Sequence, residues 1–213
     1  MTPALVAAGA FVAVGAAVAT GARNARIASL GLAVMLAAVP FVADPMAAPL
    51  SLAFGVVAGI LAGFLVFVAA RRVPDRVGPP LGFPATLGAA LAGFSAGIGA
   101  TAVTLPRLGP DAALAAGLAA LAVAVGPIAV TRDVFRLGSA LMVLVAAASL
   151  IFEALAGAPE PLTGMAEGIV LVTLAAAVTA LTGGAVAATG GTAVPDELPG
   201  RRAAATKAAG DHR

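Results

Sequence analysis

The chain has 213 residues, of which 61% are hydrophobic and only 10% are charged, and its formal net charge is +2. A soluble domain carries about 25% charged residues, so this composition excludes an ordinary water-soluble fold and indicates a membrane protein. Cysteine is absent and His212 is the only histidine, which excludes disulfides and thiol catalysis and argues against a histidine-based metal site. The basic residues are spread over several connections, so we expect no nucleic-acid surface.

Seven apolar segments follow one another along the chain, separated by proline-rich or charged connections. Each segment has about the 17–25 residues that a helix needs to cross a bilayer. The predicted helices span residues 3–21, 27–43, 47–69, 82–105, 111–131, 137–156 and 163–188. We therefore predict an all-α integral membrane protein with seven transmembrane helices in residues 1–190. The polar residues 191–213 are expected to form a flexible cytoplasmic tail.

The basic residues divide unevenly between the two sides of this predicted bundle. If successive helices alternate in direction, eleven of the twelve Lys and Arg residues fall on one side and only Arg107 falls on the other. Connections rich in Lys and Arg stay in the cytoplasm, so the N-terminus is predicted outside and the C-terminus inside. The excess of Arg over Lys, with abundant Ala and Gly, suggests a GC-rich bacterial genome. We therefore expect a multi-pass protein of the bacterial cytoplasmic membrane. Within the connections, the topology-determining residues are Arg23, Arg26, Arg71, Arg72, Arg76, Arg132 and Arg136.

Glycines recur at the spacing of helix contacts in two of the predicted helices. Gly55, Gly59 and Gly63 are four residues apart in the third helix, and Gly93 and Gly97 are four apart in the fourth. Glycine at this spacing lets two helix backbones approach closely in lipid, although 26 of the 213 residues are glycine and some coincidences are expected. Trp and Tyr are absent, so the usual interfacial aromatic belt is missing. This pattern is typical of a subunit that contacts other membrane subunits as well as lipid.

Ionisable residues at membrane depth mark ion or proton paths by default, because an isolated charge in lipid is unfavourable. The deepest carboxylates are Glu153, late in the sixth helix, and Glu167, one turn into the seventh. They are the candidate proton-path residues, and Glu167 lies either in solvent at the interface or in an external vestibule. The sequence has no phosphate-binding glycine loop, no metal-ligand spacing and no nucleophile with a base partner, so we predict no catalytic, cofactor or metal site.

Several short motifs resemble those of a known membrane family. They are Ala69-Ala70-Arg71-Arg72-Val73-Pro74, Arg132-Asp133-Val134-Phe135-Arg136, Leu141-Met142 and Ala158-Pro159-Glu160. In these stretches and in its layout the chain resembles the hydrogenase-4 component E family. Those proteins are membrane subunits of complex-I-like nickel–iron hydrogenases and formate hydrogenlyases. Residues 23–25 and 34–36 are also similar to the second helix of complex I subunit K, to which that family is related.

The resemblance implies a scaffold subunit of an oxidoreductase complex, without a cofactor, that packs between proton-channel subunits. The chain departs from the family where the family has intramembrane polar residues. Ala33, Ala58 and Val143 stand where the resemblance leads one to expect Glu or Gln, Lys and Glu, whereas Glu167 matches, with a shift, the acidic residue that opens the final helix. One alternative is a subunit of a cation/proton antiporter or of an NADH–quinone oxidoreductase. Another is a stand-alone transporter of a small solute or lipid.

Overall fold

The computed structural model describes residues 3–42, 48–73, 82–103, 112–157 and 161–192, and every regular element in these ranges is a helix. The predicted all-α fold is therefore confirmed for this part of the chain. If η1 is counted with α2, the helices begin and end within three residues of the predicted segments. They are α1 (Pro3–Gly21), α2 (Ala25–Ala38), the 3₁₀ helix η1 (Val39–Phe41), α3 (Pro49–Ala70), α4 (Phe83–Val103), α5 (Ala112–Val130), α6 (Val134–Ala156) and α7 (Pro161–Thr189). Arg76, Arg107 and residues 193–213 of the predicted tail lie outside the described residues. The prediction that the tail begins at residue 191 is wrong for Thr192, which is 1% exposed and donates a hydrogen bond of 2.9 Å to Asp133.

Six helices of the described chain, α1 and α3 to α7, are long and apolar enough to cross a membrane. The second apolar segment is shorter. It consists of α2 and η1 together and spans only Ala25–Phe41. Pro40 lies in η1 and has no N–H group for the α-helical hydrogen-bond ladder, which accounts for the change to 3₁₀ geometry. The chain thus has the character of a multi-pass membrane protein.

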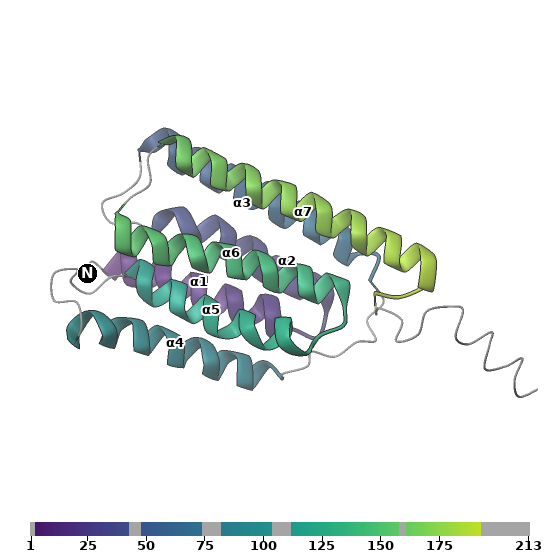
Figure 1. Cartoon of the computed structure of the whole chain (residues 1–213), viewed down its shortest axis with the longest axis horizontal. Coiled ribbons are helices and arrows are strands. Elements are labelled where there is room, and N and C mark those ends of the chain that lie inside the picture. The colour runs from purple at the N-terminus through teal and green to yellow at the C-terminus, as the bar shows by residue number, and fades with distance from the viewer. Residues whose placement is uncertain (1–2, 43–47, 74–81, 104–111, 158–160, 193–213) are drawn as a thin grey trace, which may run out of the picture.

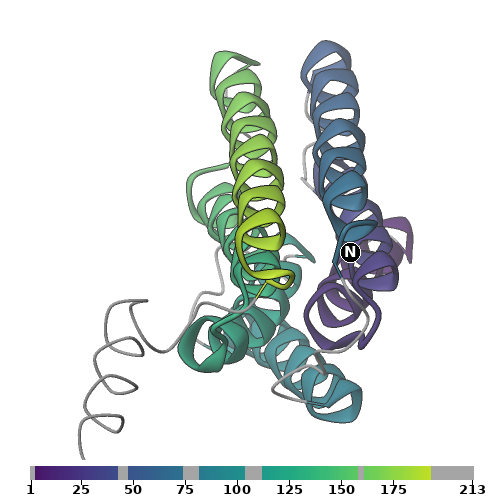
Figure 2. The same ribbon diagram turned by 90° about the vertical axis from the view of Figure 1, so that its right-hand side faces the viewer.

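The helices pack in three layers (Figure 1). The top layer consists of α3 and α7, which lie side by side and run in the same direction. The middle contains α1, α2, α5 and α6, and α4 packs against α1 and α5 on the far side. Figure 2 shows α3 and α7 standing out from the rest of the bundle. Most helices pack against their neighbours in sequence, but α3 and α4 do not, and the main long-range pairs are α3 with α7 and α1 with α4 and α5.

The three glycines of α3 face α2 and η1 across a close helix crossing. A Cβ atom on Gly59 would lie 2.7 Å from the carbonyl oxygen of Leu36, which is too close for any side chain unless the backbones separate. The facing pairs are Gly55 with Pro40, Gly59 with Leu36, and Gly63 with Ala33. Hydrogen in place of a side chain is what allows α2 and α3 to pack at this distance.

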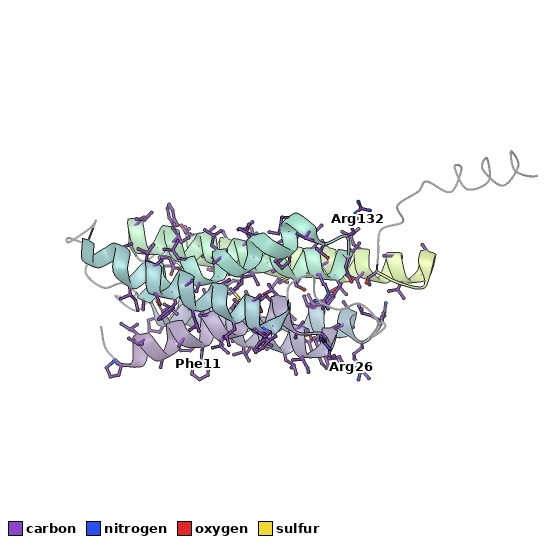
Figure 3. All side chains as sticks on the ribbon, turned by 90° about the horizontal axis from the view of Figure 1, so that it is seen from below. Phe11, Arg26 and Arg132 are labelled. Atoms are coloured by element: carbon purple, nitrogen blue, oxygen red, sulfur yellow. The ribbon has the colours of Figure 1, made fainter. Side chains whose placement is uncertain are left out.

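The glycines of α4 act in the same way against α5. A Cβ atom on Gly93 would lie 2.6 Å from the carbonyl oxygen of Leu118, and one on Gly97 would overlap Ala115. The buried interior is rich in alanine for the same reason, since small side chains let neighbouring helices approach closely. Larger side chains such as Phe11, which is 61% exposed, point outward from the bundle (Figure 3).

The arginines of the described chain lie at one end of the bundle, as Figure 3 shows for Arg26 and Arg132. Both residues follow odd-numbered helices, α1 and α5, and Arg71 and Arg72 follow α3 in the same way. We call this end the arginine end. Five of the predicted topology residues are exposed there, namely Arg23, Arg26, Arg71, Arg72 and Arg132.

Arg136 differs from the prediction, which placed it in the connection before the sixth helix. Asp133 caps α6 by accepting hydrogen bonds from the backbone N–H groups of Phe135 (2.9 Å) and Arg136 (3.2 Å), so the helix starts three residues earlier than expected. Arg136 therefore lies in the first turn and is only 9% exposed. Its Nη1 and Nη2 atoms donate to the carbonyl oxygens of Ala22 and Arg23, each at 3.3 Å. The guanidinium thus satisfies carbonyls at and beyond the C-terminal end of α1.

Candidate functional site

A cavity lies between α2 with η1, α3, α6 and α7, at the end of the bundle opposite the arginines. Its walls come from the last turns of α2 and α6 and the first turns of α3 and α7. It contains about 720 Å³ of empty space, counting the part that is open to the outside. We call it the glutamate cavity, because Glu153 and Glu167 are its charged lining residues.

α3 and α7 pack against each other along one side of the cavity. A Cβ atom on Gly168 would lie 2.7 Å from the ring of Phe54, so the two helices touch there. One turn earlier they are less tightly packed, since a Cβ atom on Gly164 would lie 3.8 Å from Cβ of Ser51. Pro40, which ends α2 in a 3₁₀ turn, lines the opposite wall. The cavity occupies the space between this proline turn and the widening α3–α7 pair.

The two glutamates reach the cavity from adjacent helices. Glu153 comes from the last turns of α6 and Glu167 from the second turn of α7, and both side chains are half-buried. The Oε2 atom of Glu153 has less than 1 Å² of its surface exposed. Ser149 precedes Glu153 by four residues, so the two side chains share one face of α6. The cavity thus combines two carboxylates and a hydroxyl with mostly aliphatic walls.

A second hydroxyl group lines the cavity from α3. Ser51 Oγ donates a hydrogen bond of 2.8 Å to the carbonyl oxygen of Ala48, which leaves the lone pairs of Oγ as acceptors. All the polar side-chain oxygens of the lining can therefore accept a hydrogen bond or attract a positive charge. In a partly apolar surrounding, the Coulomb attraction between a carboxylate and a cation is much stronger than in water. The arrangement can hold a proton or a cation.

The sequence singled out Glu153 and Glu167 separately, and the structure brings them to one cavity. Ser149 also lines the cavity, and its spacing of four residues from Glu153 indicates a shared helix face. Two further hydroxyls at membrane depth, those of Ser95 and Thr173, are exposed on the outside of α4 and α7. Pro40 and Ser51 were not predicted as site residues, because nothing in the local sequence indicates which distant helix they face.

The three positions where the resemblance leads one to expect polar residues lie within the helix packing. Val143 is fully buried in α6, and Ala58 in α3 is 5% exposed. Ala33 is half-buried in α2 and faces Gly63. The residues at these positions pack helices against one another. Within the described residues, no group of three or more His, Cys, Asp or Glu side chains could hold a metal ion.

No protein-family model matches this chain, and no curated protein or solved structure matches it either.

Proposed function

We propose that the chain is a non-catalytic membrane subunit of a complex-I-like assembly, and that the glutamate cavity is the outer mouth of a proton path. The observation that carries the proposal is that Glu153 and Glu167, on two adjacent helices, line one cavity at the end opposite the arginines. With the arginine end in the cytoplasm, this cavity faces the outside. The motif resemblance to hydrogenase-4 component E supports the type of assembly.

The residues beyond the cavity explain why a neighbouring subunit completes the path. One turn further toward the arginine end, the core contains Leu32, Met142 and Val143, whose side chains are 0% exposed. Proton transfer through such a region requires titratable side chains or water held by polar groups. A proton that enters the glutamate cavity therefore continues into a neighbouring chain, and energy conversion belongs to that partner.

The outer face of α4, on the side of the bundle away from the glutamate cavity, supports contact with a further subunit of the assembly. Gly93 and Gly97 on one face of α4 pack against α5, whereas small residues on the opposite face are exposed. The exposed residues follow helical spacing and are Gly88, Ala92, Ser95 and Gly99. Small residues in this pattern let the helix of another membrane subunit approach closely. α4 is thus suited to bridge the bundle and a partner.

Proton uptake in liposomes tests the proposal. We expect no uptake with the isolated chain, and uptake with the complex that co-purifies with the tagged chain. In the complex, Glu167→Gln and Glu153→Gln should each reduce uptake about tenfold or more, because a neutral amide cannot relay a proton. Thr173→Val on the exposed face of α7 is the matched control and should leave uptake unchanged.

Two outcomes would contradict the proposal. Proton uptake by the isolated chain would indicate a stand-alone transporter, the alternative from another functional class. Unchanged uptake by the complex when both glutamates are replaced by glutamine would remove the cavity from the proton path.

A further inference from the structure

We propose that three arginines at the arginine end bind the headgroup of an anionic phospholipid, whose acyl chains lie along the outer face of α3. They are Arg26 at the start of α2 and Arg71 and Arg72 at the end of α3, and all three are exposed. We call them the arginine corner. The proposal goes beyond the proposed function and does not depend on it. It is supported by the convergence of the three side chains, by the charge around them and by an apolar stripe that leads to them.

The crossing of α2 and α3 brings the first turn of one helix beside the last turn of the other. Gly63 of α3 faces Ala33 of α2, and the two helices run in opposite directions. Seven residues, or about two helical turns, further toward the arginine end, the same register pairs Ala70 of α3 with Arg26 of α2. The two arginines that end α3 follow Ala70 directly, so three guanidinium groups gather at this corner.

Contact with α7 holds one of these guanidinium groups in place. The Nη1 atom of Arg72 lies 3.4 Å from the position that a Cβ atom on Gly183 would occupy. Glycine therefore lets the arginine side chain rest against α7 while it stays exposed. The next residue, Gly184, would meet no other atom within 4 Å of its Cβ position, so α7 leaves open space there. A side chain that is already held in place loses less freedom when it binds a ligand.

The charge of the arginine corner matches a phosphate group. A guanidinium presents a planar set of N–H donors that fits the oxygens of a phosphate. Among the carboxylates of the described ranges, Glu153 and Glu167 line the cavity at the opposite end, and Asp133 is buried against the start of α6. These three carboxylates therefore do not neutralise the corner. Basic clusters beside the hydrocarbon region of a bilayer attract anionic headgroups.

An apolar stripe on α3 favours a lipid over a water-soluble anion. Val57, Ile60 and Phe64 are exposed, and with Arg71 they follow the spacing of one helix face. Phe64 and Arg71 are about 10 Å apart along the helix axis, since each residue adds 1.5 Å. An acyl chain can extend along this stripe from a phosphate held at the arginines. The headgroup and the chain of one lipid thus find complementary surfaces on the same helix.

Native mass spectrometry of the full chain in an uncharged detergent tests the proposal. The probes are phosphatidylglycerol and phosphatidylcholine with identical acyl chains, each titrated under the same conditions. We expect the first phosphatidylglycerol to bind at least about tenfold more tightly, because each arginine favours the anionic headgroup. Glycerol 3-phosphate, which has no acyl chain, should not displace it. Hexaglutamate, which stands for an acidic protein segment, should not displace it either.

Charge variants locate the headgroup. Arg71→Gln should weaken phosphatidylglycerol binding about fivefold, and Arg72→Gln in addition should weaken it further. Arg132→Gln removes the same charge at the same end, but Arg132 lies on the opposite side of the bundle from Arg26 (Figure 3). This control should leave the binding unchanged. All four side chains are exposed, and circular dichroism establishes that the variants retain their helices.

A pair of phenylalanine variants locates the acyl chains. Phe64→Ala removes an exposed ring from the stripe and should weaken phosphatidylglycerol binding about threefold, because apolar contact area is lost. Phe11→Ala on α1 is the matched control, since Phe11 is 61% exposed and Phe64 is 59% exposed. The control should leave the binding unchanged.

The proposal is overturned if the two phospholipids bind equally well. That result is expected if Asp75, which follows Arg72 by three residues outside the described ranges, neutralises the corner. It is also overturned if Arg132→Gln weakens binding as much as Arg71→Gln, or if the two phenylalanine variants behave alike. Displacement by glycerol 3-phosphate would indicate a site for a free phosphate compound, and displacement by hexaglutamate would indicate an acidic protein partner. Either displacement rejects the lipid site.

Discussion

Single polar residues stabilise the arginine end of the bundle from within. All buried polar side chains in the described ranges lie in this half, either near the C-terminal ends of α1 and α7 or near the N-terminal ends of α2, α4 and α6. They are Thr20, Ser29, Thr86, Asp133, Arg136, Ser139, Thr182 and Thr192. Several hydroxyls donate to a carbonyl oxygen three or four residues earlier, as Thr20 does to Ala16 at 2.9 Å. Such local bonds satisfy a hydroxyl without a partner helix.

Asp133 has the largest share in these interactions. Besides capping α6, it accepts a hydrogen bond of 2.9 Å from Thr192 Oγ1, and Val134 N donates to Thr192 O at 3.0 Å. One carboxylate therefore joins the start of α6 to the segment that follows α7. The buried guanidinium of Arg136 lies one turn away and joins α6 to the end of α1. Three distant parts of the chain meet at this point.

Replacing Asp133 by alanine should lower the free energy of unfolding by about 1–2 kcal/mol, because the cap of α6 and the bond to Thr192 are both lost. Asp133→Asn keeps an acceptor oxygen for the cap and should be less destabilising. Arg26→Ala, on an exposed side chain at the same end, is the control and should change stability by less than about 0.5 kcal/mol. Thermal unfolding in detergent measures the differences. Equal melting temperatures for Asp133→Ala and the wild type would contradict the assigned role.

At the scale of whole helices, glycine determines how closely the elements pack. The α3 glycines were expected to pack against other helices, and the structure shows that the facing helix is α2, with η1, of the same chain. A bulky residue at Gly59 would therefore destabilise the fold of this chain directly. It would affect assembly with partner subunits only as a consequence of that destabilisation. The α3–α7 pair also packs closely at a glycine, Gly168, and Thr179 Oγ1 of α7 shares its proton between Ala175 O of its own helix (2.7 Å) and Leu65 O of α3 (3.0 Å). Both pairs frame the glutamate cavity.

Gly59→Leu should lower the free energy of unfolding by about 1–3 kcal/mol or more, because the new side chain meets the backbone of α2 at Leu36. Gly184→Leu on α7 is the matched control, because a Cβ atom there has no other atom within 4 Å. The control should be neutral or slightly stabilising, since leucine favours a helix more than glycine does. Thermal unfolding of the two variants under identical conditions gives the comparison. The same loss of stability in both would contradict the close α2–α3 crossing.

At the scale of the whole molecule, the two ends of the bundle differ in chemistry. The arginine end carries exposed guanidinium groups and a hydrogen-bonded interior, whereas the opposite end carries the glutamate cavity. α7 has 29 residues, more than the roughly 20 that a bilayer requires, and it extends past α3 at the arginine end (Figure 1). Because the exposed arginines gather at one end, we expect the arginine end to lie in the cytoplasm.

Reporter fusions at the two ends test this orientation. A fluorescent protein that matures only in the cytoplasm should fluoresce when it is fused after Gly190, and a phosphatase that works only outside the cytoplasm should be inactive there. Fusion after Gly157, at the other end of α6, should give the opposite pair of results. Phosphatase activity after Gly190 would reverse the orientation and place the glutamate cavity inside the cell.

The sequence alone determined the number, the approximate bounds and the apolar character of the helices. A helix in lipid satisfies its backbone hydrogen bonds within its own segment, so its position follows from local composition. The placement of arginines after alternate segments likewise followed from counting along the chain. The start of α6 was misplaced, because Asp133 was assigned to the connection and its role as a helix cap was overlooked.

Only the tertiary structure decided which helices are neighbours, and therefore what the predicted residues do. Glu153 and Glu167 were each recognisable as deep carboxylates, but the cavity between them also needs Pro40 and Ser51, which lie about a hundred residues earlier in the chain. The facing partners of Gly59 and Gly97, and the bonds of Arg136 to the end of α1, are equally non-local. Contacts between membrane helices depend on close packing of small residues over whole surfaces, and this chain carries such residues on nearly every helix face. Local sequence therefore specifies the helices, whereas the fit between their surfaces selects one arrangement.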